Sequence, residues 1–244
     1  MRKILAVETK LYLREWPAML FSIVLPVGLL LVLGSIPDMG KADPALGGQR
    51  ITDTHLPAMM TLLAMLTLAF TVLPTVLTTY RERGVLRRMS TTPVHPARML
   101  AGQLLINVAV GAVSTALVIV LGRLVLGTAM PRQPVGFVLV FLLGTAALMA
   151  MGLVIAALAR TGKAASGIGS VVMFPLMFVA GMWIPREFMP GALRVFSDFS
   201  VAGPFAQAMR ATWAGDWPQP LHLAVMAAGV LVFGWLAVRL FRWE

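Results

Sequence analysis

Long apolar segments alternate with short polar segments along almost the whole chain of 244 residues. Each apolar segment is close to the length of about 20 residues with which a helix crosses a hydrocarbon core of about 30 Å. Backbone groups cannot stay unpaired in lipid, and the strict polar and apolar alternation of a β-barrel strand is missing, so these segments are predicted to be helices. The predicted spans are residues 18–36, 57–79, 100–121, 135–158, 166–184 and 221–238.

Composition agrees with a lipid solvent. Hydrophobic residues make up 59% of the chain and charged residues 12%, and the mean hydropathy is +0.85. A soluble domain is about 25% charged. The predicted fold class is therefore an all-α membrane protein with six transmembrane helices, in which residues 1–244 form a single transmembrane domain.

Charge and cysteine content exclude some classes of function. The net charge of +10 does not indicate nucleic-acid binding, because the basic residues sit in short clusters between the spans. Membrane topology and anionic lipid headgroups account for such clusters. The chain has no cysteine, which excludes disulfides and thiolate metal sites.

Lysine and arginine are divided unevenly between the two sides of the predicted spans. One side carries Arg2, Lys3, Lys10, Arg14, Arg81, Arg83, Arg87, Arg88, Arg98, Arg160, Lys163, Arg239 and Arg242. The other side carries Lys41, Arg50, Arg123, Arg132, Arg186, Arg194 and Arg210. Cytoplasmic loops retain positive charge, so we predict a multi-pass protein of the cell (inner or plasma) membrane with both termini in the cytoplasm.

Residues 1–16 precede the first predicted span. They include Glu8 and Glu15, which is unlike the short basic start of a signal peptide. Basic residues fall on one helical face, and Leu5, Tyr12 and Trp16 share a roughly opposite face. We predict a helix that lies on the membrane surface. A basic flank that only sets topology is the alternative.

The segment 185–220 is unusually rich in aromatic and large apolar residues for an exposed loop. Pro190 and Pro204 each stand where the first residue of a helix would stand, and apolar residues follow at helical spacing. We predict two short extracellular re-entrant helices that dip into the outer leaflet before the last span. The alternative is a loop packed on the outer ends of the spans.

The sequence carries no energy source of its own. No Asp or Glu lies inside a predicted span, so coupling to proton or sodium movement is not expected. The phosphate-binding pattern GxxxxGK[ST] fails at its only candidate, because Ala157 replaces the first glycine and Ala164 replaces the Ser/Thr. Any ATP and magnesium are therefore expected on a separate partner ATPase, and no cofactor is expected on this chain.

A membrane enzyme is not expected either. Ser166 and Ser170 lie among small residues, but His55, His95 and His222 fall in loops or at a span boundary. A serine nucleophile at membrane depth therefore has no predicted base. The sequence HExxH is absent, and no metal site is predicted.

The predicted cytoplasmic loop at residues 80–98 contains more than topology requires. Besides arginines it has one acid, Glu82, together with Gly84, apolar residues and a Thr-Pro stop. An acid in a basic loop is better explained by a specific hydrogen-bonded partner than by topology, so we predict such a partner for Glu82. This pattern predicts a short amphipathic coupling helix that ends before Pro93 and fits a cleft in a soluble partner. The residues predicted to couple the chain to an ATPase are Arg81, Glu82, Arg83, Gly84, Leu86, Arg87, Arg88 and Pro93.

Two runs of sequence resemble a known family, the ABC-2 permeases, and within it the group typified by daunorubicin/doxorubicin exporters. The loop that couples this family to its ATPase is similar to YRERGVLRRMSTTPVHPARMLAGQLL. The family signature around the fifth helix is similar to AGMWIPREFMPGALRVFSDFSVAGPFAQAMR. Its recognisable positions here are Gly181, Pro185, Pro190 and Pro204.

The resemblance implies the permease half of an ATP-driven exporter, without an ATPase of its own. Two such halves, identical or different, would pair with two separate ABC ATPase subunits and move a drug, a lipid or a glycan-like substrate outward. Membrane lipids are the other expected partners. A membrane scaffold or a channel component without transport activity is the alternative.

A soft apolar route for the substrate is predicted from the sequence. Methionine and phenylalanine side chains in the fifth span adapt to varied apolar molecules, and a proline within a span can provide a hinge. The predicted route consists of Pro74, Met173, Phe174, Phe178 and Met182. Ordinary packing and lipid contact are the alternative for each of them.

Overall fold

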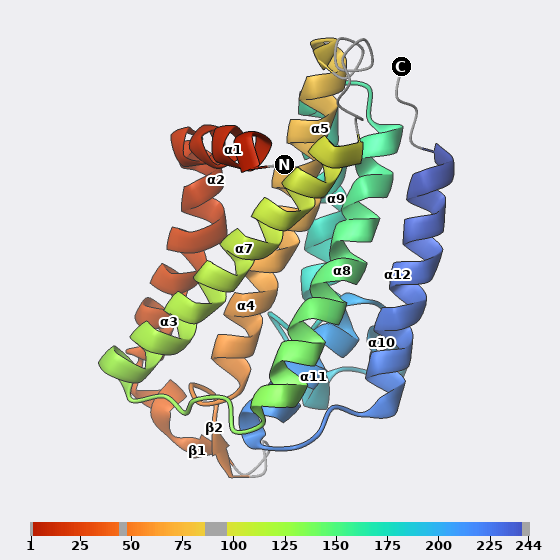
Figure 1. Cartoon of the computed structure of the whole chain (residues 1–244). Coiled ribbons are helices and arrows are strands. Elements are labelled where there is room, and N and C mark those ends of the chain that lie inside the picture. Colours follow the sequence, from red (N-terminus) through yellow and green to blue (C-terminus); the bar gives the residue numbers. More distant parts are fainter. Residues whose placement is uncertain (1, 44–47, 86–96, 241–244) are drawn as a thin grey trace.

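The computed structural model describes residues 2–43, 48–85 and 97–240, and these form a bundle of helices (Figure 1). Six helices among the described residues are long and apolar enough to cross a membrane. They are Trp16–Gly34, His55–Glu82, Arg98–Leu126, Pro134–Leu158, Gly162–Val179 and Pro220–Leu240. The predicted fold class, all-α with six candidate transmembrane helices, is confirmed.

Three of the six spans change helical type along their length. The first consists of α2 (Trp16–Met19), the π-helical turn η1 (Leu20–Val24) and α3 (Leu25–Gly34). The second consists of α4 (His55–Thr67), the π-helical turn η4 (Leu68–Val72) and α5 (Leu73–Glu82). The third is α7 (Ala97–Leu121) with the π-helical turn η5 (Gly122–Leu126). The fourth, fifth and sixth are α8 (Pro134–Leu158), α9 (Gly162–Val179) and α12 (Pro220–Leu240).

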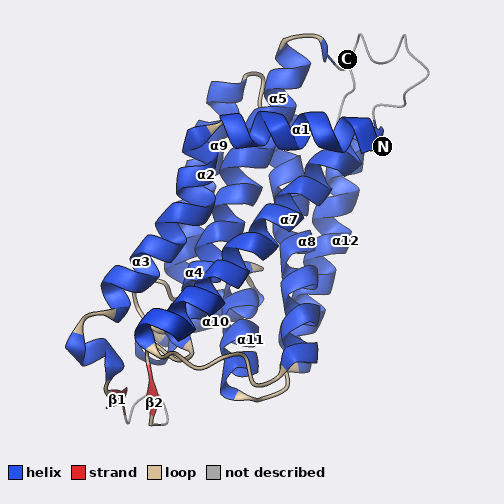
Figure 2. Ribbon diagram, turned by 60° about the vertical axis from the view of Figure 1, so that its left-hand side comes forward, coloured by secondary structure: helices blue, strands red, loops and turns tan. Residues whose placement is uncertain are grey.

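The two ends of the bundle differ in structure. At one end, called here the α1 end, helix α1 (Arg2–Arg14) lies across the tips of the spans, and α12 also ends there (Figures 1 and 2). The opposite end, called the hairpin end, carries the antiparallel strands β1 (Ala42–Asp43) and β2 (Gln49–Arg50) and the 3-10 turn η2 (Pro37–Gly40). It also carries the 3-10 turn η6 (Arg186–Phe188) and the short helices α10 (Gly191–Phe199) and α11 (Ala202–Ala214).

The bounds of two predicted spans were wrong. The third continues beyond residue 121 to Leu126, where Gly127 ends it with a φ of 66°. The fifth runs from Gly162 to Val179 rather than over residues 166–184. It starts early because the Thr161 side chain caps it by accepting a 3.2 Å hydrogen bond from the Ala164 backbone N–H. It ends early because Gly181 turns the chain with a φ of 89°.

Two predictions about helix starts and faces also need correction. The N-terminal helix ends at Arg14, and the backbone changes direction at Glu15, so Tyr12 is buried whereas Trp16 is 71% exposed. Pro190 precedes the first residue of α10, and Pro204 is the third residue of α11. Proline is tolerated there because the first turn of a helix has no internal use for its N–H groups.

The second span is the core of the bundle. In its most apolar stretch 94% of the residues are buried, against 22% in the first and sixth spans. The Thr67 hydroxyl donates within the helix to the Leu63 carbonyl at 2.9 Å, whereas the buried hydroxyls of Thr61, Thr75 and Thr78 have no partner among the described residues. The other spans therefore provide the contact with lipid, and they screen the second span from it.

A π-helical turn interrupts this central span because of Pro74. Proline has no N–H, so the Phe70 carbonyl lacks the donor that residue 74 supplies in an α-helix. The Leu73 N–H donates to the Leu68 carbonyl, so the Ala69 carbonyl loses its α-helical donor as well. Two consecutive carbonyls are left without their regular partners in the middle of the bundle.

Two glycines of neighbouring helices approach these carbonyls closely. A Cβ built on Gly152 of α8 would lie 1.9 Å from the Ala69 oxygen, and one on Gly169 of α9 would lie 1.8 Å from the Phe70 oxygen. Only a glycine allows such an approach, and its Cα–H groups can face a carbonyl oxygen as weak donors. The π turn is therefore the site where α8 and α9 pack directly on the central backbone.

We predict that Gly152→Ala and Gly169→Ala each destabilise the protein by about 3 kcal/mol, because the added methyl group meets backbone rather than a movable side chain. The matched control is Gly167→Ala in α9, where a Cβ has no neighbouring atom within 4 Å. The free energy of unfolding of this control variant should stay within about 1 kcal/mol of the wild-type value. Thermal unfolding in detergent tests this. Equal stability of Gly169→Ala and Gly167→Ala would contradict the packing role of the π turn.

Candidate functional site

The strongest candidate site is the α1 end of the second span. Helix α5 ends at Glu82, Arg83 follows it, and Gly84 turns the chain with a φ of 65°. Arg81, Glu82, Arg83 and Gly84 are thus placed at one helix terminus. The other residues predicted for coupling, Leu86, Arg87, Arg88 and Pro93, lie outside the described residues, as does the predicted coupling helix.

Arg81 and Glu82 bind the short turn that joins α8 to α9. The Arg81 guanidinium donates to the carbonyls of Ala157, at 3.5 Å, and Ala159, where α8 ends. The Glu82 carboxylate accepts a 3.2 Å hydrogen bond from the Gly162 backbone N–H, where α9 begins. The sequence predicted a specific hydrogen-bonded partner for Glu82, and this partner is the chain's own backbone.

The charges match the helix termini that they touch. A cation is favourable at the C-terminal carbonyls of a helix and an anion at its N-terminal N–H groups, by about 0.3–1 kcal/mol each. Gly162 also lets α9 approach α5, because a Cβ there would lie 2.5 Å from the Thr79 hydroxyl. The end of α5 and the turn between α8 and α9 therefore form one connected unit, which we call the α5 clamp (Arg81, Glu82, Ala159 and Gly162).

A second polar cluster holds α1 against the bundle. The Glu8 carboxylate is 7% exposed and accepts hydrogen bonds from the Tyr80 hydroxyl, at 2.8 Å, and from the Gln103 amide. The Tyr12 hydroxyl shares a 2.7 Å hydrogen bond with the Ser22 hydroxyl. Burial raises the pKa of Tyr12 above its usual value of 10.0, so its hydroxyl keeps its proton at neutral pH. These contacts connect α1 to the first, second and third spans.

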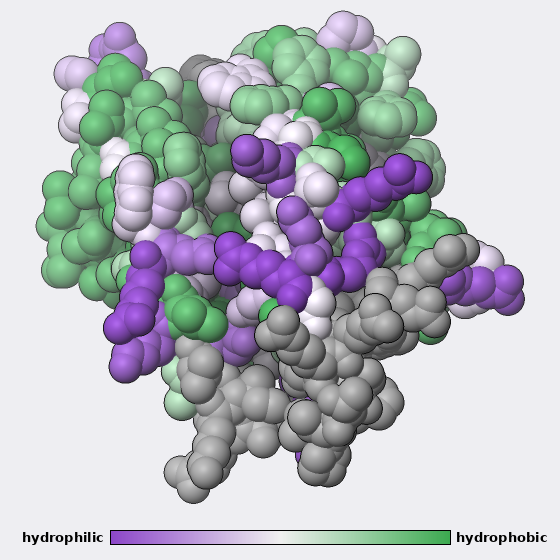
Figure 3. Space-filling model, turned by 90° about the horizontal axis from the view of Figure 1, so that it is seen from above, coloured by the Kyte–Doolittle hydropathy of each residue, from purple (hydrophilic) through white to green (hydrophobic). Residues whose placement is uncertain are grey.

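Viewed from the α1 end, hydrophilic residues form a band across the middle of the molecule, and hydrophobic residues dominate the surface above this band in the view (Figure 3). This pattern is expected where polar helix termini meet and lipid-facing helix sides remain apolar. The α5 clamp and the Glu8 cluster both involve the end of the second span, which is the most buried of the six.

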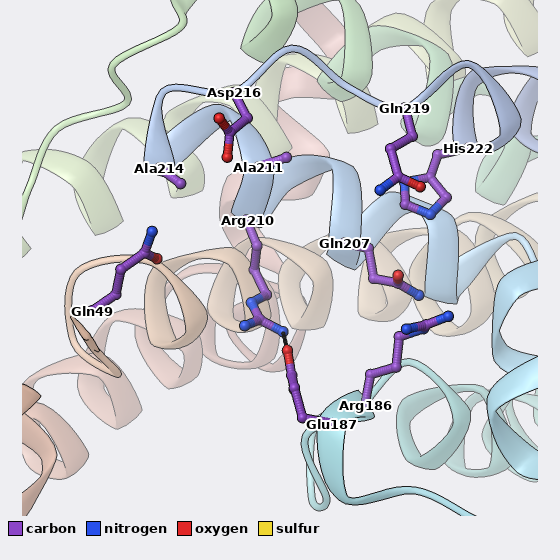
Figure 4. Close-up of a pocket in the computed structure, with 10 residues that line it drawn as sticks. All are labelled: Gln49, Arg186, Glu187, Gln207, Arg210, Ala211, Ala214, Asp216, Gln219 and His222. Carbon is purple, nitrogen blue, oxygen red and sulfur yellow. Dashed lines mark hydrogen bonds and ion pairs between the residues drawn. The ribbon is translucent and has the colours of Figure 1, made fainter. Parts of the chain in front are cut away.

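The hairpin end holds a different kind of charge cluster. Arg186 donates to both carboxylate oxygens of Asp198, at 2.8 and 2.5 Å, and Arg210 pairs with Glu187 at 3.0 Å. Two adjacent residues of η6 are thereby bound to α10 and α11, beside a cavity of about 270 Å³ (Figure 4). The Gln207 amide also donates to Asp198 at 3.2 Å.

These contacts shift the pKa values at the hairpin end. The hydrogen bonds from Arg186 hold the pKa of Asp198 below its usual 3.8, against a smaller opposite effect of burial. The same pair raises the pKa of Arg186. Burial raises the pKa of Glu187, but its backbone hydrogen bond and Arg210 outweigh this and leave the pKa lowered. Arg186, Glu187 and Asp198 therefore stay charged near neutral pH.

Comparison with known proteins identifies the family. The family model described as "ABC-2 type transporter" matches residues 2–213. The chain belongs to this family. The chain is also similar to the daunorubicin resistance ABC transporter permease protein DrrB1 of Streptomyces coeruleorubidus, at 29% identity over 236 residues, which cover 94% of this chain and 81% of that protein. It is therefore a multi-pass transmembrane subunit of an ABC transporter, the component that pairs with an ABC ATPase and a partner permease.

In this ABC-2 permease the four residues that resemble the family signature lie at or beside turns and helix starts. Gly181 has the positive φ that ends α9, and Pro185 and Pro190 precede η6 and α10. Pro204 lies in the first turn of α11, which is buried against α4, α8 and α12. These four residues thus set the course of the short segments that carry the ion pairs of the hairpin end.

The five residues predicted for a substrate route are not brought together as one lining. Pro74 is buried in the central span, and Met173 and Met182 pack against the core. Phe174 and Phe178 are 58% and 39% exposed on the outer side of α9. None of the five lines the cavity at the hairpin end. Their role in transport remains a prediction.

The sequence analysis gave no structural role to Glu8, Tyr80 or Gln103. The available signal was an acid on an otherwise basic surface helix, four residues before Tyr12 and so on the same helical face. A charged residue on the buried side of such a helix requires a polar partner. The identity of that partner depends on contacts across 72 and 95 residues.

We predict that Asp198→Asn destabilises this ABC-2 permease by about 1–3 kcal/mol at neutral pH, since charge-assisted hydrogen bonds to Arg186 are lost. The lowered pKa of Asp198 means that its contribution is present above about pH 4 and is lost as pH falls through the folded pKa. The difference in melting temperature between wild type and variant should therefore shrink in acid. Asp216→Asn, at the same cavity, is the control, and its melting temperature should match that of the wild type. A constant difference at all pH values would contradict this assignment.

Proposed function

We propose that this chain is the permease half of an ATP-driven exporter that moves an amphipathic or hydrophobic substrate out of the cytoplasm. The printed name of the similar protein, a daunorubicin resistance permease, supports a drug-like amphiphile among the candidate substrates. The apolar sides of the spans and the polar α1 end suit a substrate that enters from the membrane.

The proposed complex contains two permease halves, identical or different, and two separate ATPase subunits that bind ATP and magnesium. The α1 end faces the cytoplasm in this proposal, as the distribution of lysine and arginine requires, and both termini lie there. The substrate passes between the two halves. The membrane is the cell (inner or plasma) membrane.

The α5 clamp is the observation that carries the proposed mechanism. Arg81 and Glu82 belong to the loop predicted to bind the ATPase, residues 80–98, and they bind the ends of α8 and α9. A displacement of this loop therefore also displaces the turn between α8 and α9, which lies at the same end. Because α8 and α9 pack on the central backbone at Gly152 and Gly169, the displacement extends along both helices.

Topology gives the first test. The native chain has no cysteine, so single cysteines can be introduced without a background signal. Lys163→Cys, at an exposed position in the first turn of α9 at the α1 end, should react with an impermeant maleimide only after the cells are opened. Lys41→Cys, 74% exposed at the hairpin end, should react in intact cells. The reverse pattern would overturn the orientation.

Coupling gives the second test, in vesicles that contain the permease and its ATPase. We predict that Glu82→Gln and Gly84→Val each lower export about fivefold or more, which is the scale of a typical coupling free energy. Glu82→Gln weakens the bond to the Gly162 N–H, and Gly84→Val places a β-branched residue at a φ of 65°. Export and ATP hydrolysis should be measured at equal amounts of membrane protein.

The control is Lys163→Ala, which removes one exposed basic residue from the first turn of α9. It should leave export unchanged. ATPase binding should persist in all three variants. Normal export by both Glu82→Gln and Gly84→Val would contradict the transmission role of the α5 clamp. No export by the wild-type complex, with any amphiphile tested, would instead favour a scaffold or channel component.

A further inference from the structure

Two adjoining cavities lie at the α1 end, on the side of the first and second spans. The first, of about 200 Å³, is the head cavity and is lined by Glu8, Glu15, Tyr80, Arg83 and Gln103 among others. The second, of about 310 Å³, is the tail cavity and is lined by Pro17, Ala18, Phe21, Thr71 and Val72 among others. Glu15, Thr75 and Val76 line both, so the cavities share a wall and adjoin each other.

The head cavity carries more negative than positive charge. Glu8 is buried, and its partners among the described residues are the neutral donors Tyr80 and Gln103. Glu15 is exposed and has no hydrogen bond or ion pair with another described side chain. Arg83 is the one cation among the described lining residues, and it is exposed and forms no ion pair with either acid. Two carboxylates and one guanidinium leave an excess of negative charge.

This charge is opposite to that of its surroundings. The chain has a net charge of +10, and the loops at the α1 end carry most of its lysine and arginine. Topology does not require acids there, because acidic residues contribute little to orientation. A carboxylate that is partly removed from water and not paired with a cation attracts one.

The tail cavity is suited to an apolar group. It extends from Glu15 along the first span to Phe21 and faces Thr71 and Val72 of the central π turn. Phe21 is 51% exposed, which leaves the cavity open beside the lipid-facing side of the first span. Pockets for drug-sized ligands have volumes of about 300–1,000 Å³. The tail cavity alone, at about 310 Å³, reaches this range.

We propose that the head and tail cavities together bind an amphiphile whose polar end is a protonated amine. The ammonium group lies between Glu8 and Glu15, and the apolar body lies between the first span and the central span. This inference deepens the proposed export function by assigning an entry site and a substrate class, but the binding step does not require the ATPase. The amphiphile is either a soluble cationic compound or an aminophospholipid of the membrane, since both present the same ammonium group.

Binding at this site also has a mechanical consequence. Glu8 and Glu15 flank the end of α1, and Tyr80 lies one residue before the α5 clamp. Glu8 accepts the hydrogen bond from Tyr80, so a cation beside Glu8 acts directly on the contact between α1 and the second span. Occupancy of the cavity is communicated to the same helix terminus that precedes the predicted coupling loop.

The test uses the purified full chain in phosphatidylcholine nanodiscs, without ATPase. The probe is a dansyl-tagged long-chain alkylammonium, and the matched probe is the same tagged chain ending in a methyl group. Energy transfer from tryptophan to dansyl measures binding. We expect the wild type to bind the ammonium probe at least about tenfold more tightly than the methyl probe, the scale of one charge-assisted contact.

Glu15→Gln is the main variant, because this side chain has no bond to another described side chain whose loss would perturb the fold. It should weaken binding of the ammonium probe about tenfold and leave the methyl probe unchanged. Glu15→Asp, which keeps the charge, should retain most of the affinity. Asp216→Asn at the hairpin end is the control and should bind like the wild type. Glu8→Gln should also weaken binding, and its melting temperature reports any loosening of α1.

Equal binding of the two probes by the wild type would overturn the proposal, as would unchanged binding in both Glu15→Gln and Glu8→Gln. Replacing part of the phosphatidylcholine with phosphatidylethanolamine identifies the source of the amine. Displacement of the probe assigns the site to an aminophospholipid, and lack of displacement assigns it to a soluble cationic amphiphile. Intact binding together with absent export would refute the export function and leave this site in place.

Discussion

The packing of α8 and α9 on the backbone of the central span is the constraint on which the rest of the structure depends. A buried helix in a membrane has no water to satisfy a free carbonyl. Pro74 and the π turn remove the regular donors of the Ala69 and Phe70 carbonyls, and Gly152 and Gly169 bring two neighbouring helices against them. The contact fixes the depth of α8 and α9 relative to the central span. A change of register in either helix would bring a side chain against a backbone oxygen.

The register of α8 and α9 determines which contacts α5 makes at the α1 end. The turn between α8 and α9 lies at the level at which α5 ends, so Arg81 and Glu82 can reach a helix C-terminus and a helix N-terminus at the same time. The connection consists of charged side chains on backbone dipoles, each worth about 0.3–1 kcal/mol where exposed. At the hairpin end, by contrast, charged side chains bind each other, with two hydrogen bonds between Arg186 and Asp198.

The sequence was sufficient to predict the six spans, because a lipid solvent imposes the same length and composition on every crossing helix. It also indicated that Glu82 needs a hydrogen-bonded partner, because membrane topology does not require an acid in a basic loop. The partner itself, Gly162, lies 80 residues away, and only the register of α9 brings it there. The π turn was not predicted, because Pro74 signals a lost hydrogen bond but not how the helix adjusts to it. Glu8 was missed because its buried face depends on Tyr80 and Gln103 in other spans.

The difference between the two ends indicates where a conformational change begins. Arg186 and Asp198 must lose two charge-assisted hydrogen bonds to separate, whereas the Glu82 carboxylate is held by one bond of 3.2 Å and is exposed. Between the two ends, the packing of α8 and α9 on the π turn of the central span is rigid. The contacts of Gly152 and Gly169 there involve backbone atoms, so they cannot adapt by side-chain rotation. In the proposed mechanism, a force applied at the α1 end is transmitted through the α5 clamp and tilts α8 and α9 as units about their contact with the central span. The ion pairs at the hairpin end keep η6, α10 and α11 together during this motion, so they move as one body.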